Sequence, residues 1–181
     1  MKKIFIAVCM FLSFVLVCNA DILISYKGLD NVHLKFSCSV DDGIKKVELR
    51  AYPEGEGEEV LFSTEDIPKG GGVISGTIHH TGLSKGKIYT YKIYRTYITN
   101  KEQMYYSVSV FINGTTIEGD RLLFNETINS PAELNFTKLT VPKDITLTVN
   151  ANLEGYAQID VQGAIIFKSG ISLQKPVIYF N

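Results

Sequence analysis

The sequence has no tryptophan and only three cysteines among its 181 residues, and two of these cysteines lie within the first 20 positions. The remaining one, Cys38, cannot close a disulfide bond within its own chain. No group of cysteines and histidines has the spacing of metal ligands either. The stability of the fold must therefore come from burial of apolar side chains, and we predict neither a metal nor a cofactor.

The chain also lacks an excess of basic residues. Its formal net charge is −1 at pH 7, and it becomes −3 once Lys2 and Lys3 leave with an amino-terminal leader. Proteins that bind nucleic acid use lysine and arginine to neutralise phosphates, so we expect no nucleic-acid partner. No apolar run after residue 20 approaches the length of a membrane span, and we expect no span in the mature protein.

The first 20 residues have the pattern of a secretory signal peptide. Two lysines precede an apolar run from Ile4 to Cys18, and Ala20 is a small residue of the kind that signal peptidase reads. We expect cleavage after Ala20 and a secreted, periplasmic or cell-surface protein. Two alternatives stay open. The run of about 15 residues is short for a retained membrane anchor, and Val17 disfavours a lipoprotein attached at Cys18.

After the leader, apolar and polar side chains alternate with a period of two, and no segment before residue 113 has helical spacing. Such alternation turns one face of a strand toward a core and the other toward water, as in antiparallel sheets. Turns rich in glycine, proline and aspartate separate the runs. The pattern predicts strands at residues 22–26, 31–40, 44–52, 58–64, 73–80, 87–98 and 104–112.

The stretch GLSKGKIYTYKIYRTY, residues 82–97, resembles the motif of fibronectin type III domains. Leu83 precedes a turn, Tyr89 follows six residues later, and apolar side chains continue at every second position. The resemblance implies a seven-stranded antiparallel sandwich, fibronectin-type-III-like or immunoglobulin-like, over residues 21–112. It also implies that the Tyr89 hydroxyl bonds back to the preceding loop. Arg95, where the family has a small apolar residue, departs from the pattern.

From residue 134 the alternation resumes in shorter runs. The stretch from Asp144 to Phe180 resembles the small β-stack modules that end many secreted Bacteroidetes proteins. We therefore expect an all-β protein with a sandwich and a smaller carboxy-terminal β module. Its parts are a signal peptide at 1–20, the sandwich at 21–112, a polar linker at 113–133 and the module at 134–181. The alternative is that the module is not separate and the chain forms one extended β structure.

Two groups of residues invite a metal interpretation. His79 and His80 are neighbours on an expected strand, so they point to opposite faces and cannot chelate one ion by themselves. Whether His33 comes near either of them is open. The Asp41-Asp42-Gly43 stretch lacks the D-x-D-x-D-G spacing of a calcium loop, and we expect a turn there.

No pattern of catalysis is present. Cys38 alternates with core residues and is expected to be buried and inert. The sequence has no G-x-S-x-G nucleophile motif and no glycine-rich phosphate loop, and its acidic residues lie mostly in turns. We therefore predict no enzyme and no catalytic residues.

The surface offers one candidate for binding, formed by Lys92, Tyr94, Tyr97 and Tyr105 on two neighbouring strands. These residues either pair across strands as in any sheet, contact a protein, or stack on a glycan. We expect an exported non-enzymatic protein in adhesion, cell-envelope structure or protein–protein contact. The alternative is a carbohydrate-binding module or an accessory domain of an extracellular hydrolase, although glycan-stacking surfaces are often rich in tryptophan.

Overall fold

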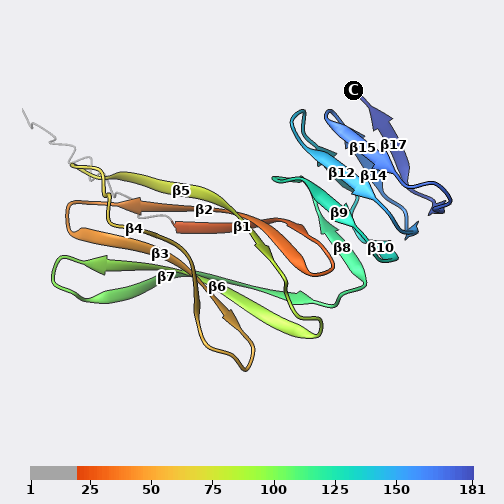
Figure 1. Cartoon of the computed structure of the whole chain (residues 1–181). Helices are drawn as coiled ribbons and strands as arrows, with labels where there is room; N and C mark the ends of the chain where they lie inside the picture. Colours follow the sequence, from red (N-terminus) through yellow and green to blue (C-terminus); the bar gives the residue numbers. More distant parts are fainter. Residues whose placement is uncertain (1–19) are drawn as a thin grey trace, which may run out of the picture.

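The computed structural model describes residues 20–181, which form strands, turns and irregular segments (Figure 1). The alternative lipidation site at Cys18 and all of the expected signal peptide except Ala20 lie outside the described residues. Within residues 20–181 no helix has the length and apolar character needed to cross a membrane.

Seven long antiparallel strands form two layers in the first part of the chain (Figure 1). One layer contains β1 (Ala20–Lys27), β2 (Asn31–Val40) and β5 (Gly72–Thr81). The other is a four-stranded sheet in the order β4 (Glu59–Thr64), β3 (Ile44–Pro53), β6 (Lys87–Tyr97) and β7 (Glu102–Ile112). These strands lie where the period-two pattern predicts them.

The two layers share one hydrophobic core because each strand turns alternate side chains inward. The core joins residues of β2, such as Leu34 and Phe36, to residues of β3 and β6, such as Leu49, Tyr91 and Ile93. Burying a large apolar side chain contributes roughly 1.5–3 kcal/mol. This core is therefore a main source of stability for the first part of the chain.

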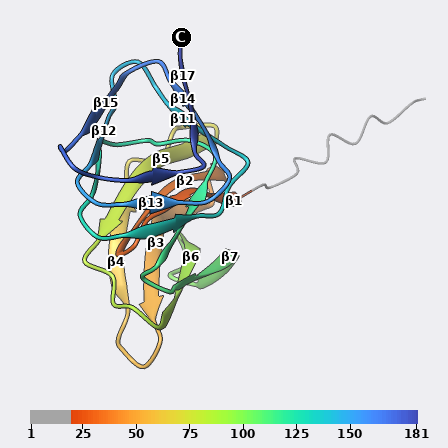
Figure 2. The same cartoon turned by 90° about the vertical axis from the view of Figure 1, so that its right-hand side faces the viewer.

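Beyond Ile112 the chain winds into a β-solenoid, in which stacked coils contribute short strands to three faces (Figures 1 and 2). All strand pairs between successive coils are parallel. The first face contains β8 (Thr116–Gly119), β10 (Ala132–Leu134), β13 (Leu153–Glu154) and β16 (Leu173–Gln174). The second contains β9 (Glu126–Ile128), β12 (Thr146–Val149) and β15 (Ala164–Phe167). The third contains β11 (Lys138–Val141), β14 (Gln158–Val161) and β17 (Val177–Phe180).

Apolar side chains stack from coil to coil inside the solenoid. Leu139 pairs with Ile159, and Ile159 pairs with Ile178, so one coil takes about 20 residues, the spacing of a repeat architecture. On another face Leu147 pairs with Ile165 of the next coil. No coil buries its own apolar face alone, so each depends on its neighbours for stability.

The two parts of the chain are joined by a continuous sheet. Strand β1 pairs with β8 antiparallel, through Tyr26 with Gly119 and Lys27 with Glu118. A seven-stranded sheet therefore runs in the order β16-β13-β10-β8-β1-β2-β5 from the solenoid into the first part. The stretch 113–133, expected as a linker, contains β8, β9 and the beginning of β10.

The prediction of a fibronectin-type-III-like or immunoglobulin-like sandwich followed by a small β-stack module is therefore wrong. The parallel coils and the shared sheet overturn both resemblances. The physical reason is that a period of two indicates only which face of a strand is buried. It indicates neither whether the neighbouring strand is parallel or antiparallel nor which segment that neighbour is, such as β8 beside β1. The alternative of one extended β structure agrees with the continuous sheet.

The Tyr89 side chain connects the beginning of β6 to the preceding turn. Its side chain is 4% exposed, and its hydroxyl accepts a hydrogen bond of 2.7 Å from the backbone N–H of Ser84. We expect Tyr89→Phe to lower the free energy of unfolding by about 0.5–1.5 kcal/mol, because the Ser84 N–H loses its protein partner while the ring is kept. Urea denaturation measures this, with Tyr156→Phe, a ring that is 79% exposed, as the neutral control. Equal effects of the two changes would contradict the role of the hydroxyl.

Candidate functional site

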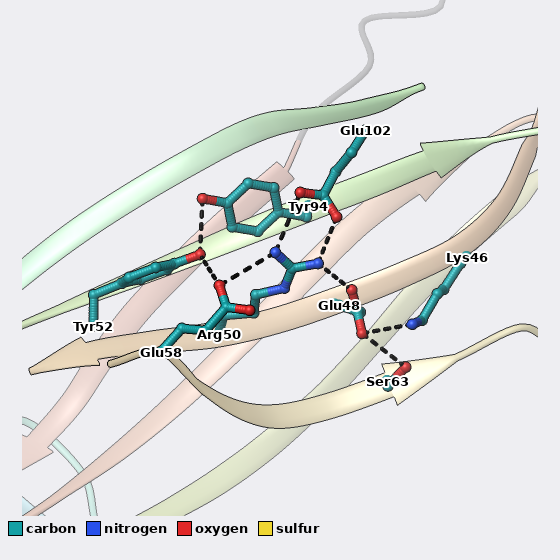
Figure 3. A network of polar contacts seen from close by, with 8 residues as sticks. All are labelled: Lys46, Glu48, Arg50, Tyr52, Glu58, Ser63, Tyr94 and Glu102. Atoms are coloured by element: carbon teal, nitrogen blue, oxygen red, sulfur yellow. Dashed lines mark hydrogen bonds and ion pairs between the residues drawn. The ribbon is translucent and has the colours of Figure 1, made fainter. Parts of the chain in front are cut away.

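The outer face of the four-stranded sheet carries a dense network of polar side chains (Figure 3). On β3, Val47, Leu49 and Ala51 are buried in the core, so the residues between them turn outward. Across the strands, Glu48 lies opposite Tyr94 and Arg50 lies opposite Lys92. We call the outward set Lys46, Glu48, Arg50, Tyr52, Glu58, Lys92, Tyr94 and Glu102 the Arg50 network.

Arg50 is the centre of this network. Its Nη2 lies 2.5 Å from Glu48 Oε2 and 2.5 Å from Glu102 Oε2, and its Nη1 lies 3.4 Å from Glu58 Oε2. The guanidinium carbon also lies 4.4 Å from the centre of the Tyr94 ring. Burial would lower the pKa of Arg50, but hydrogen bonds to Glu102 and Glu48 outweigh it and raise that pKa. The guanidinium is held on several sides and stays charged.

Glu48 is an ionised carboxylate in a nearly buried position, 6% exposed. It lies 2.8 Å from Lys46 Nζ, and Ser63 Oγ donates to it at 3.4 Å. Burial would raise the pKa of Glu48, but hydrogen bonds from Lys46 and Arg50 outweigh it and lower that pKa. Charge-assisted hydrogen bonds of this kind are stronger than neutral ones, so they hold the carboxylate in one place.

The tyrosines of the network are covered by cations. Lys92 Nζ lies 4.3 Å from the centre of the Tyr52 ring, in the same way that Arg50 covers Tyr94. The two phenols also contact each other, because the Tyr52 and Tyr94 hydroxyls share a hydrogen bond of 3.0 Å. One face of each ring is therefore occupied by a charged group of the protein itself.

The structure brings together two of the four surface residues that the sequence suggests. Lys92 and Tyr94 belong to the Arg50 network, whereas Tyr97 packs against the hydrophobic core. Tyr105 lies beneath the buried Arg95, whose guanidinium carbon is 3.5 Å from the ring centre. The Tyr97 and Tyr105 hydroxyls are 3.0 Å apart, and this hydrogen bond, with burial, raises the pKa of Tyr97 to about 12. The four residues do not form one aromatic surface.

Sequence reasoning missed most of the network. In the sequence, Glu48 and Arg50 occupy ordinary outward positions of an alternating strand. The parity of residues 46–52 indicates that Glu48, Arg50 and Tyr52 share a face. Glu102 is 52 positions from Arg50, and no local pattern links the two residues.

The other candidate residues have structural partners. His80 contacts the Tyr91 hydroxyl and a carboxylate oxygen of Glu59, each at 3.1 Å. Asp41 accepts a hydrogen bond from the Gly43 N–H at 2.8 Å, as a turn residue does. Cys38 is buried, and its sulfur lies 3.1 Å from Arg95 Nε. The His79 ring packs edge-on against His33, with ring centres 4.5 Å apart.

No family model matches the chain, and no curated protein matches it. Among solved structures, the sensor domain of an anti-sigma factor of Pseudobacteroides cellulosolvens is 14% identical, with a TM-score of 0.33, over 52% of this chain and 97% of that one. A polysaccharide deacetylase of Bacillus cereus is 9% identical, with a TM-score of 0.36, over 76% of this chain and 60% of that one.

A pectate lyase of Erwinia chrysanthemi is 12% identical, with a TM-score of 0.35, over 90% of this chain and 62% of that one. The chain thus spans less than two thirds of the length of the deacetylase and of this lyase. Identities and TM-scores this low carry no function over to this chain.

Proposed function

We propose that the protein is an exported, non-enzymatic binding protein that contacts a protein partner through the Arg50 network. The observation that supports this most directly is the fixed arrangement of Arg50 between carboxylates and the Tyr94 ring. Arginine and tyrosine are enriched among the residues that contribute most to protein interfaces. Side chains already held in place lose little conformational entropy on binding.

Exposed apolar side chains flank the network on the same face. Met104 lies opposite Tyr94 and Phe111 lies opposite Ile88 on the neighbouring strands, and Val60 lies opposite Arg50. Each of these apolar residues is between 41% and 51% exposed. A protein interface combines apolar and aromatic contacts with polar groups in this way.

The charges of this face indicate what a partner should offer. Arg50 is only 12% exposed in its side chain, whereas Glu58 and Glu102 are 48% and 41% exposed. Among the charged groups of the Arg50 network, these two carboxylates are therefore the most exposed. We expect the partner to present lysine or arginine beside an apolar patch, and its association to weaken as salt is added.

A glycan partner is less well supported. Stacking on a sugar ring needs a free aromatic face, and Arg50 and Lys92 each cover one face of the tyrosines here. The chain also has no tryptophan. The role of a carbohydrate-binding module, or of an accessory domain of a hydrolase, is therefore the alternative that the binding experiment must distinguish.

We expect Met104→Glu to weaken capture of the partner by about 10-fold or more, because it places a carboxylate in the apolar rim of the interface. The purified protein is immobilised, its partner is captured from the envelope and extracellular fractions, and affinity is then measured with the purified partner. Val73→Glu, on a β5 position that is 61% exposed, is the control and should leave affinity unchanged.

Two results would contradict the proposal. Reproducible glycan-array binding that is lost in Tyr94→Ala would support the carbohydrate alternative. Hydrolytic activity that persists through purification to homogeneity would contradict a non-enzymatic role.

A further inference from the structure

Two histidines and a glutamate meet where the first part of the chain joins the solenoid. His33 of β2 pairs directly with His79 of β5, and Glu126 comes from β9 in the first coil. One ligand atom from each residue lies within 4.8 Å of the other two. The ring of Phe124 stacks on His79, with ring centres 5.2 Å apart, and borders His33 at 5.3 Å. Three distant segments thus bring nitrogen and oxygen donors together.

The donor atoms of this cluster are buried and lack hydrogen-bond partners. His33 is 0% exposed and Glu126 is 6% exposed. Among the described residues, His33 Nε2, His79 Nε2 and Glu126 Oε2 are buried atoms with no hydrogen bond. His33 Nε2 and Glu126 Oε2 lie 3.3 Å apart without the geometry of a hydrogen bond. Buried polar atoms are nearly always satisfied, and an unlocated ion is one recognised explanation when they are not.

Glu126 is held so that one oxygen stays available. Its Oε1 accepts hydrogen bonds from Asn31 Nδ2 at 3.2 Å and from the Thr127 N–H at 3.1 Å. Oε2 is left facing His33. Hydrogen bonds that orient a carboxylate in this way are typical of the outer shell of a metal site.

We propose that His33, His79 and Glu126 bind a divalent transition metal ion of the zinc class. Imidazole nitrogen and carboxylate oxygen are ligands of zinc, with bonds of about 2.0–2.2 Å. Two ligands on a tetrahedral ion with such bonds lie roughly 3.3 Å apart, which agrees with the separation of His33 Nε2 and Glu126 Oε2. The partly exposed His79 side chain moves closer to complete the set.

One contact opposes binding through His33 Nε2. The Leu123 N–H donates to His33 Nδ1 at 3.3 Å, and a ring bound to metal through Nε2 carries its proton on Nδ1. This hydrogen bond is at the long end of the usual range, so its loss is small beside the gain of several metal–ligand bonds. The bound ion would connect β2 and β5 to the first solenoid coil and stabilise this junction.

The test is a titration of the purified, chelator-treated protein with Zn²⁺ by calorimetry and with Co²⁺ by visible absorption. We expect one ion per chain, a Co²⁺ spectrum typical of tetrahedral coordination, and a higher melting temperature with Zn²⁺. His79→Ala and Glu126→Gln should each lower Zn²⁺ affinity by at least about 100-fold and abolish the melting shift. His80→Asn is the matched control, since the His80 ring faces Tyr91 instead.

The wild-type titration decides the proposal even if a variant at fully buried His33 fails to fold. Absence of stoichiometric Zn²⁺ binding by folded wild-type protein would overturn it. So would unchanged affinity in folded His79→Ala and Glu126→Gln, because the ion would then be held elsewhere.

Discussion

Gly163→Ala is expected to lower the free energy of unfolding by about 3 kcal/mol, the largest effect of a single methyl group that we predict for this chain. Gly163 lies between β14 and β15, where one coil passes against the turn of the coil before it. A Cβ atom at this position would come within 3.0 Å of the backbone oxygens of Pro142 and Ile145. Real Cβ atoms essentially never approach other atoms so closely.

The obstructing atoms cannot move aside cheaply, because they belong to main chain. The turn that holds them is flanked by β11 and β12, which pair with β14 and β15 of the next coil. The Gly163 N–H itself donates to the Val141 carbonyl at 3.2 Å. An added methyl group must therefore separate two coils and weaken parallel ladders on two faces.

Urea denaturation followed by circular dichroism measures the loss. Gly57→Ala is the matched control, because nothing lies within 4 Å of a Cβ at that position, and it should be nearly neutral. Hydrogen exchange should accelerate most in β12, β14 and β15, since solenoid coils contact only their neighbours. A neutral Gly163→Ala would mean that the coils do not stack as closely as described.

Arg50→Ala is expected to lower the free energy of unfolding by about 2–3 kcal/mol at pH 7. The change removes the cation between Glu48, Glu58 and Glu102 and leaves the nearly buried Glu48 with Lys46. Removing one partner of a buried ion pair is costly because the other charge stays desolvated. The expected loss of unfolding free energy is smaller than for a fully buried pair, since two of the three carboxylates are exposed and screened.

The effect should depend on pH in a defined direction. The pKa of Glu48 is lowered in the folded protein, so its contribution to stability is present above the unfolded pKa of about 4.3. That contribution is lost as the pH falls through the lower folded pKa. The difference between wild type and Arg50→Ala should therefore be largest near neutrality and shrink in acid.

Denaturation at pH 7 and at about pH 3 tests this direction. Arg50→Lys is the control that keeps a positive charge but loses the planar fork that contacts several carboxylates at once. It should fall between wild type and Arg50→Ala. A difference between wild type and Arg50→Ala that is the same at both pH values would contradict the role assigned to Glu48.

Much of the first part of the chain was predictable from local sequence. Alternation located β2, β3 and β6 and indicated that Leu34, Leu49 and Tyr91 turn inward, and all three are fully buried. The same parity placed Lys92 and Tyr94 outward. It did not reveal that Tyr105 lies under Arg95, because β7 is irregular where it pairs with β6 beside Tyr94 and an irregularity changes which face a side chain occupies.

The candidate sites required contacts between distant segments. Glu102 reaches Arg50 only because β6 lies between β3 and β7 in the sheet. Glu126 reaches His33 only because the first coil continues the sheet of β1 and β2. Nothing in the spacing of these residues indicates that they meet.

Local alternation in the sequence is enough to predict that the protein is built of strands, where the long strands lie and which of their side chains are buried. These properties follow from the stereochemistry of an extended chain, whose side chains alternate whatever the neighbouring strand is. The stacking of Leu139, Ile159 and Ile178 in parallel coils and the pairing of β1 with β8 are visible only in the folded chain. Strand direction and partner depend on hydrogen bonds between segments far apart in sequence, and a period of two is the same for both directions.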